Sequence, residues 1–403
     1  MRTLERRTAF GLMAVTLAAL LFASSAPSPL YVIYQAQWDF SALTLTGVFA
    51  VYAIALLSAL LVAGSLSDHL GRRPVLLAAL VVEIVAMLVF AVAPSVLWLF
   101  AARILQGLAT GVAMGCISAA LLDLQPPERD WQGALTGVVA PLSGLAAGAI
   151  FAGVLADRSA DPVGLVFWLL LAVFVAMAAL ALFLPETVER GDGWRDSLRP
   201  RIGVPPHVRT AFAAALPSMI ATWSLGGLVL SLGPSISQEL VGADTHVEAA
   251  LPIFALAGIS AVTSFAVRHT DPRTAARAGL SALITGVAVV LLAVATSSGV
   301  LFLIGAAISG LGFGPSFAGV FRALTDMADP DRRAELVSSV LTAAYLAFSA
   351  PALAAGLAVT QVGLEDTVVV YGATLIVVAS VALALTGRLS AVSARPVAGT
   401  SLT

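Results

Sequence analysis

Twelve long apolar runs constrain the fold of this chain more than any other feature of its sequence. Each run has about 20 residues or more, the length that an α-helix needs to cross a bilayer. The runs do not alternate in polarity and are too long for the strands of a membrane barrel. The sequence therefore predicts an all-α membrane protein with 12 transmembrane helices. The expected spans lie near 10–35, 42–64, 74–93, 96–122, 132–156, 163–184, 209–237, 247–267, 277–296, 299–323, 335–361 and 367–386.

The composition agrees with a lipid bilayer as the main partner of the chain. Hydrophobic residues make up 59% of it and charged residues only 11%, against about 25% charged in soluble domains. A net charge of −2 and the lack of a basic tract argue against a nucleic-acid partner. The single cysteine, Cys116, lies in an apolar run, so we expect a packing role and no internal disulfide.

The arginines predict the orientation of the spans, because cytoplasmic loops of membrane proteins are enriched in basic residues. With a cytoplasmic N-terminus, 19 of the 21 basic residues fall in cytoplasmic segments, leaving Arg158 outside and Arg103 within a span. We therefore expect a multi-pass protein of the plasma (inner) membrane with both termini in the cytoplasm. The 19 are Arg2, Arg6, Arg7, Arg72, Arg73, Arg129, Arg190, Arg195, Arg199, Arg201, Arg209, Arg268, Arg273, Arg277, Arg322, Arg332, Arg333, Arg388 and Arg395.

The start of the chain has some features of a cleaved signal peptide: arginines, an apolar stretch and the small residues Ala23–Ala26. Pro27 directly after that stretch disfavours cleavage, and the apolar character resumes at Tyr31. We therefore expect the first helix to be retained.

The two halves of the chain repeat. Gly107–Gly111 aligns with Gly310–Gly314 at an offset of 203 residues, and the same offset places Asp123 on Asp326. Duplication of a six-span unit gives a parallel repeat, with substrate bound between the halves near the midplane. We expect two pseudo-symmetric six-helix bundles. Their bounds are 1–186 and, with a short cytoplasmic tail, 209–403, joined by a cytoplasmic linker over 187–208.

A polar hinge separates the second and third runs and reads Gly64-Ser-Leu-Ser-Asp68-His-Leu-Gly71-Arg72-Arg73-Pro74-Val-Leu76. Glycines permit tight turns, and an acid followed by arginines can form ion pairs that hold neighbouring helices. The hinge resembles the signature of the major facilitator superfamily, G-x-L-x-D-x-x-G-R-[RK]-x-x-L, at every defining position. The resemblance implies a secondary transporter that works by alternating access.

The resemblance also implies a conformational latch on the cytoplasmic side. Asp68 would face the start of the eleventh helix near 335–339, and Arg72 would pair with Asp123 at the inner end of the fourth helix. The second half keeps Asp271 but lacks the Gly-Arg-Arg sequence, so we expect an asymmetric latch. The expected latch residues are Gly64, Asp68, Gly71, Arg72, Arg73 and Asp123.

Two charged residues lie within spans, where charge is costly. Arg103 opens a segment that resembles the fourth-span signature R-x-x-Q-G, which implies a role in proton coupling or in orienting helices. Alternatively, Arg103 only bonds backbone carbonyls of the first helix. Glu83 could carry protons, since low dielectric favours its neutral form, or it could simply bond a neighbouring helix. The helical rise places Glu83 and Arg103 within about 5 Å in depth, so the two could pair.

Small residues recur along the fifth run, which resembles in part the G-x-x-x-G-P-x-x-G-G motif of proton-driven exporters. Ala140 and Leu145 stand where that motif has glycine. Small residues at helical spacing permit close packing, and proline bends a helix, so ordinary packing is an alternative explanation. The residues that we expect to pack or bend helices are Gly107, Gly111, Gly137, Pro141 and Gly144.

In this superfamily helices one, four, seven and ten line the cavity. That analogy implies a mostly aromatic and aliphatic set of substrate contacts, which suits a lipophilic solute better than a sugar. The candidates are Tyr31, Tyr34, Gln35, Gln106, Met114, Trp223, Phe313 and Phe317.

The leading functional prediction is therefore a monomeric secondary transporter, closest to the drug/proton antiporters, which exports a lipophilic or drug-like compound in exchange for protons. The alternative is a proton symporter or facilitator that takes up a metabolite such as a sugar or organic acid. A membrane enzyme or sensor is more remote, because no His-Glu-x-x-His, Walker-type loop or large soluble domain is found. We expect no cofactor and no metal.

Overall fold

The structure is a computed structural model that describes residues 3–129, 131–188, 191, 194–200, 202–329 and 332–386. Over these ranges it contains helices, turns and loops but no strand. Among the described residues, twelve helical spans are long and apolar enough to cross a membrane, which confirms the all-α, twelve-span prediction. The expected tail after 386 lies outside the described residues. So do five arginines of the charge count, Arg2, Arg190, Arg201, Arg388 and Arg395.

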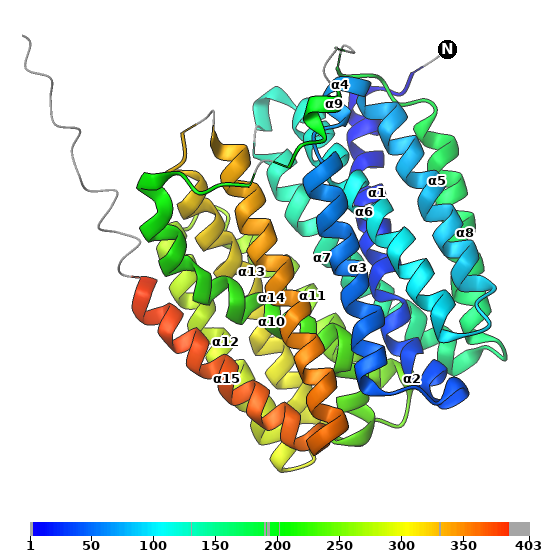
Figure 1. Ribbon diagram of the computed structural model, residues 1–403, viewed down its shortest axis with the longest axis vertical. Coiled ribbons are helices and arrows are strands. Elements are labelled where there is room, and N and C mark those ends of the chain that lie inside the picture. Colours follow the sequence, from blue (N-terminus) through cyan, green and yellow to red (C-terminus); the bar gives the residue numbers. More distant parts are fainter. Residues whose placement is uncertain are drawn as a thin grey trace, which may run out of the picture.

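The spans form two groups that lie side by side (Figure 1). The first group holds α1 (Arg6–Ser25) with α2 (Pro27–Trp38), α3 (Ala42–Ala63), α5 (Arg72–Ala91), α6 (Val96–Leu124), α7 (Gln132–Arg158) and α8 (Pro162–Ala181). The second holds α10 (Arg209–Glu239), α11 (His246–Ala266), α12 (Pro272–Ala295), α13 (Gly299–Thr325), α14 (Arg333–Val362) and α15 (Leu364–Leu385). Short helices in the connections are α4 (Ser67–Leu70), η1 (Pro127–Arg129), α9 (Trp194–Ser197) and η2 (Pro206–Val208).

The helix ends agree with the predicted runs to within five residues. The largest difference is at the ninth span, which begins at Pro272 and not at 277. Asp271 precedes this helix, and its carboxylate accepts a hydrogen bond from the N–H of Thr274 (3.0 Å). A capping aspartate followed by proline is a favourable helix start, so the helix extends beyond its apolar part.

The first span is divided at Pro27, where α1 ends and α2 begins. Proline has no N–H, so the carbonyl of Ala23, four residues earlier, loses its helical donor. Another helix satisfies this carbonyl, because Nε2 of Gln106 in α6 donates to it (3.1 Å). The break in α1 therefore presents backbone acceptors to α6 in the middle of the bundle.

Glycines let α6 pack closely on α3 and let α7 pack closely on α1. A Cβ added at Gly107 or Gly111 would overlap backbone carbonyls of α3, and one added at Gly144 would overlap the carbonyl of Ala18 in α1. Pro141 lies inside α7, which remains a single helix. Close approach of backbones through small residues is a common way for membrane helices to associate.

Gly137 does not share this packing role, which corrects the prediction for that residue. Gly144 of α7 lies against Ala18 of α1, and Gly137 and Gly11 stand seven residues earlier in the same two helices. A Cβ added at Gly11 or Gly137 would nevertheless meet no atom within 4 Å. Since both glycines face open space, α1 and α7 have diverged at this level. The same spacing therefore marks a packed face at one end of α7 and an unpacked face at the other.

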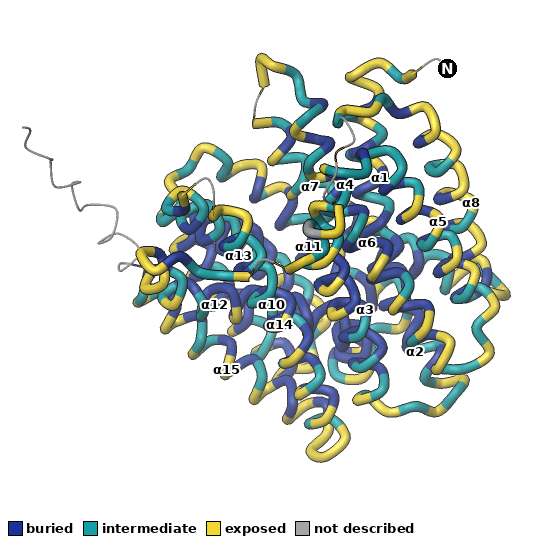
Figure 2. Tube along the Cα trace, turned by 45° about the horizontal axis from the view of Figure 1, so that its top comes forward, coloured by how far each residue is buried: buried dark blue, intermediate teal, exposed yellow. Residues whose placement is uncertain are grey.

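The outer surface of the spans is apolar. Large side chains such as Val81, Val262 and Val370 are 56%, 68% and 65% exposed, while buried residues gather inside and between the two groups (Figure 2). A helix bundle that exposes so many apolar side chains requires an apolar surrounding, as a bilayer provides.

The most extensive contacts between the groups are those of α3 with α14 and of α7 with α11. We call the side that carries 64–71, at the top of Figure 1, the hinge side, and the opposite side the far side. On the far side a Cβ added at Gly356 of α14 would overlap the Thr46 hydroxyl of α3, and one at Gly153 of α7 would approach the backbone of His246. The groups are therefore joined closely on the far side.

Candidate functional site

The hinge is a sharp turn that ends at the start of α5. Gly71 has φ of 98°, a conformation that favours glycine, and a Cβ there would also meet a carboxylate oxygen of Glu186 at 2.6 Å. That carboxylate accepts hydrogen bonds from the N–H of Arg72 (2.7 Å) and of Arg73 (3.2 Å). Glu186 thus caps the free N–H groups of the first turn of α5. No sequence motif predicts that Glu186 caps α5.

Arg72 is the centre of an ion-pair cluster on the hinge side. Its guanidinium contacts the carboxylate of Asp68 and lies 3.2 Å, through Nε, from Oδ2 of Asp123 at the end of α6. The hydroxyl of Thr187 donates to the same Asp123 oxygen (2.9 Å), and Arg6 donates to the Asp123 backbone carbonyl. The predicted partners Arg72 and Asp123 are thus brought together, and the cluster links α1, α5, α6 and the segment after α8.

Gly64 is the remaining glycine of the expected latch and ends α3. A Cβ added at Gly115 of α6 would come within 2.9 Å of the Gly64 Cα. Gly64 therefore marks the last close contact between α3 and α6 before the hinge.

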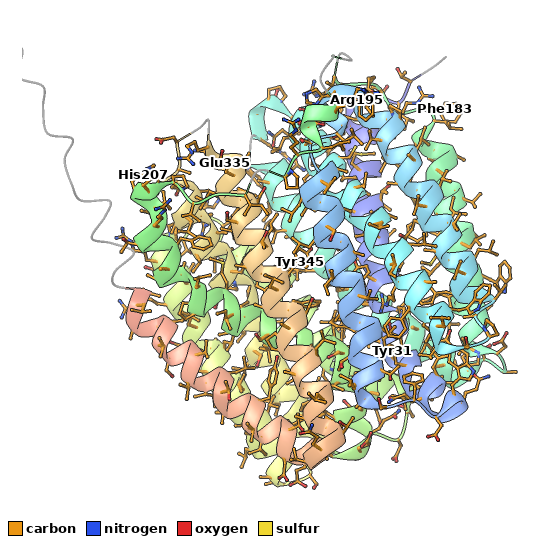
Figure 3. The ribbon with its side chains drawn as sticks, in the orientation of Figure 1. Tyr31, Phe183, Arg195, His207, Glu335 and Tyr345 are labelled. Carbon is orange, nitrogen blue, oxygen red and sulfur yellow. The ribbon has the colours of Figure 1, made fainter. Side chains whose placement is uncertain are left out.

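The expected contact between Asp68 and the start of the eleventh helix is not formed, which corrects that expectation. Asp68 instead pairs with Arg72, one turn along the chain. Glu335 at the start of α14 is held by Arg332 (2.9 Å), and Figure 3 shows Glu335 at the hinge-side end of the second group. The hinge cluster is therefore internal to the first group in this conformation.

The second half carries a different arrangement at the equivalent hinge. There Arg322 of α13 donates to the backbone carbonyls of Arg268 (3.0 Å) and Thr270 (3.2 Å). Hydrogen bonding from the N–H of Thr274 holds the pKa of the Asp271 carboxyl below its usual value, so Asp271 remains an ionised cap. The second half lacks the Gly-Arg-Arg sequence of the first hinge. Its positive charge at the equivalent place comes from Arg322 of the adjacent helix α13.

A buried polar network lies in the middle of the first group. Arg103 is fully buried and its Nε donates to the Tyr31 hydroxyl (2.6 Å). Its Nη1 donates to the Ser24 carbonyl (2.9 Å) and to Oε1 of Gln106 (2.7 Å). Arg103 therefore bonds a backbone carbonyl of the first span, as the structural alternative expected, and also joins side chains of α2 and α6.

Glu83 and Arg103 do not form a direct ion pair, which corrects the suggestion that they could pair. Gln106 lies between them, because its Nε2 is 3.4 Å from Oε1 of Glu83 while its Oε1 accepts from Arg103. Both charged side chains are fully buried. Oε2 of Glu83 and Nη2 of Arg103 have no hydrogen-bond partner among the described residues. The network therefore retains one free acceptor and one free donor.

The predicted substrate contacts separate into groups. Tyr31 and Gln106 belong to the buried network. The Tyr34 ring contacts that of Trp38 in a tilted arrangement, with ring centroids 4.7 Å apart. Gln35 donates to the Phe40 carbonyl (3.3 Å) in the turn that follows α2. Gln35 thus has a local structural partner near the end of its helix.

The three aromatic candidates of the second half gather in a cluster on the second group, where it meets α3. Trp223 is its centre, 6.4 Å from Phe313 and 5.2 Å from Phe317 between ring centroids. Tyr345 and Phe348 of α14 also contact Trp223, at 5.2 and 5.9 Å, and Tyr345 faces the first group (Figure 3). Sequence reasoning missed both because it did not expect α14 to contribute, although their three-residue spacing puts them on one helix face.

Tyr52 of α3 connects the cluster to the polar network. Its ring packs in one apolar cluster with Tyr345, and Met114 and Trp223 pack against that cluster. The Arg103 guanidinium lies 5.2 Å from the centroid of the same ring. The two sites are therefore adjacent across α3. Within the described residues, no group of three or more His, Cys, Asp or Glu side chains could hold a metal ion.

Comparison with known families decides what kind of protein carries this site. A sequence model of the Major Facilitator Superfamily matches residues 12–352. The chain belongs to the major facilitator superfamily. No curated protein sequence matches it significantly. Family membership and the twelve spans make it a multi-pass membrane protein. Membership of this family also supports secondary transport of a small molecule, which favours a transporter over an enzyme.

Solved structures of other major facilitator proteins have the same fold. A bacterial homologue of the human lysosomal transporter Spinster, inward-facing and occupied, matches with a TM-score of 0.76, 14% identity, and 95% and 97% of the two chains covered. The nucleoside transporter NupG matches at 0.69 and 13%, covering 96% and 100%. The human organic anion transporter MFSD10 (TETRAN) matches at 0.64 and 18%, covering 94% and 100%. Identities this low show the fold alone.

Proposed function

We propose that this protein exports a lipophilic, drug-like compound in exchange for protons, by alternating access, with its hinge side in the cytoplasm. The moving bundles would be 1–186 and 209–403, tethered by 187–208. The observation that carries the proposal is the buried network of Glu83, Gln106, Arg103 and Tyr31, which joins a protonatable group to the break in the first span.

The network offers a physical route from protonation to helix movement. When Glu83 is neutral, Gln106 bridges it to the Ala23 carbonyl, and Arg103 holds Ser24 and Tyr31. An ionised Glu83 would attract the free Nη2 donor of Arg103 and draw it away from the first span. Loss of these bonds would leave the Ser24 carbonyl and the Tyr31 hydroxyl without their arginine donor, which favours a new position of α1 and α2.

The aromatic cluster supports the substrate class. Five aromatic side chains, Trp223, Phe313, Phe317, Tyr345 and Phe348, meet where the two groups join, and the buried Trp223 Nε1 has no hydrogen-bond partner among the described residues. Such a surface binds planar apolar rings, with one donor to orient an acceptor on the ligand. It offers little to a polyhydroxylated sugar.

Replacing Glu83 by glutamine tests the proposal, because it keeps the bond with Gln106 but fixes the group as neutral. In proteoliposomes loaded with ethidium, a planar lipophilic cation, we expect wild-type protein to move protons opposite to the dye. Glu83→Gln should lose gradient-driven transport by at least about tenfold, which corresponds to about 1.4 kcal/mol, yet still exchange dye for dye.

The matched control is Glu248→Gln, since Glu248 is an exposed acid on the far side and its flux should not change. Proton movement in the same direction as the dye would favour a symporter over an exporter. Unchanged proton flux in Glu83→Gln would exclude the carrier role of Glu83.

The hinge cluster gives a second prediction. Asp68→Asn or Arg72→Ala removes a charge from the pair that links α4 and α5 to Asp123, so the latch cannot re-form in each cycle. We expect transport to fall about tenfold while membrane insertion and thermal stability change little, because these ion pairs are partly exposed. Arg277→Ala, an exposed arginine of α12, is the control. Normal rates in both purified hinge variants would refute the latch.

A further inference from the structure

One carboxylate on the far side crosses from the first group of helices to the second. Asp157, next to last in α7, accepts a hydrogen bond at Oδ1 from the backbone N–H of His246 (2.8 Å) and at Oδ2 from that of Val247 (3.0 Å). Its Oδ1 also lies 2.8 Å from Nδ1 of the His246 ring. These three contacts join the end of α7 to the start of α11.

The contact has a clear electrostatic basis. The first N–H groups of a helix have no partner within it, and they carry partial positive charge. In α11 the Thr245 hydroxyl caps the N–H of Glu248 (3.1 Å). The Asp157 carboxylate, which belongs to the first group of helices, caps the two preceding N–H groups, those of His246 and Val247. The start of α11 is therefore capped partly by its own chain segment and partly by Asp157.

Gly153 allows this approach. It lies one turn before Asp157, and a Cβ there would come within 2.8 Å of the His246 carbonyl oxygen and 3.1 Å of the Val247 Cα. The side chains of Asp157 and His246 are 22% and 28% exposed, and the Asp157 carboxylate makes three hydrogen bonds at once. The contact therefore has more partners than an ordinary surface ion pair, which joins only two side chains.

On the hinge side of the same helix pair, the contact between described residues is of a different kind. There the Arg268 guanidinium lies 5.6 Å from the ring centroid of Trp131 at the start of α7. On that side α1 has also separated from α7 at Gly11 and Gly137. When two rigid groups rock about a central site, contacts on one side must open as the other side closes.

We infer that Asp157, together with His246 and Val247 at the start of α11, forms an outer clasp, which keeps the far side closed in this conformation and opens once in each transport cycle. Asp157 is a positioning residue that sets the balance between the two open states. This inference rests on alternating access in the proposed function, but it depends on neither the substrate nor the coupling ion.

A distance measurement tests the clasp without any transport assay, so it can fail independently of proton-coupled export. Spin labels at Ala160 and Glu365, exposed residues on the far side of the two groups, report their separation by double electron–electron resonance in nanodiscs. We expect Asp157→Ala to raise the population with the longer distance at least about fivefold. Glu248→Ala should not, because its carboxylate bonds Asp244 within the same connection.

Asp157→Asn guards against misfolding of the alanine variant. Its amide keeps one acceptor for the α11 N–H groups but has no charge, so we expect an intermediate rise in the long-distance population. A graded series from wild type through Asn to Ala, with unchanged circular dichroism, supports the clasp. Wild-type distance distributions in both folded Asp157 variants would overturn it.

Discussion

Arg103→Met is expected to abolish transport and to lower the free energy of unfolding by about 3–5 kcal/mol, the usual cost of breaking a buried charged network. Methionine fills a similar space but donates no hydrogen bond, so the Tyr31 hydroxyl, the Ser24 carbonyl and Oε1 of Gln106 all lose their donor. Dye flux in proteoliposomes and thermal unfolding in detergent measure the two effects.

Arg103→Lys separates charge from geometry. A lysine ammonium keeps the positive charge but cannot present a planar fork of donors to three acceptors. We therefore expect partial recovery of stability with transport still well below the wild-type rate. Arg277→Ala on the exposed face of α12 should change neither. Wild-type flux in Arg103→Met would show that the network is not required for transport.

The twelve spans could be predicted because the bilayer constrains hydrophobic length so strongly. Hydropathy alone located every span, and its largest error in a helix end is at the ninth span, where capping by Asp271 before Pro272 extends the helix beyond its apolar part. The break at Pro27 was not predicted, because the apolar run over 10–35 reads as one span, although proline is the residue type that interrupts a helix. Its consequence could not be predicted either, because the carbonyl of Ala23 is satisfied by Gln106 from a distant helix.

For the charged residues, sequence motifs predicted some contacts and missed others. The Arg72 and Asp123 pairing was anticipated and the two side chains are in contact. Glu186, 114 residues after Arg72, was not recognised as the cap of α5. Depth along the helices placed Glu83 near Arg103. It could not show that Gln106 stands between them. The rise along a helix gives the depth of a residue in the membrane, but not the direction in which its side chain points.

The clearest failure concerns glycine spacing, and it leads to a direct comparison. Gly111 and Gly137 both belong to small-residue motifs, so sequence spacing treats them alike. In the structure a Cβ at Gly111 would overlap the Leu56 carbonyl and come within 2.8 Å of the Ala59 Cβ, whereas one at Gly137 would meet nothing within 4 Å. Periodicity identifies a face of a helix but not the distance to its neighbour.

Gly111→Ala is therefore expected to lower the free energy of unfolding by about 3 kcal/mol, the upper part of the usual range for overpacking. The added methyl group meets backbone of α3 and not a flexible side chain, so α3 and α6 must separate. Gly137→Ala should be neutral or stabilising by up to about 1 kcal/mol, since alanine favours the helix. Thermal unfolding of both purified variants makes the comparison, and equal stabilities would contradict the close packing of α6 on α3.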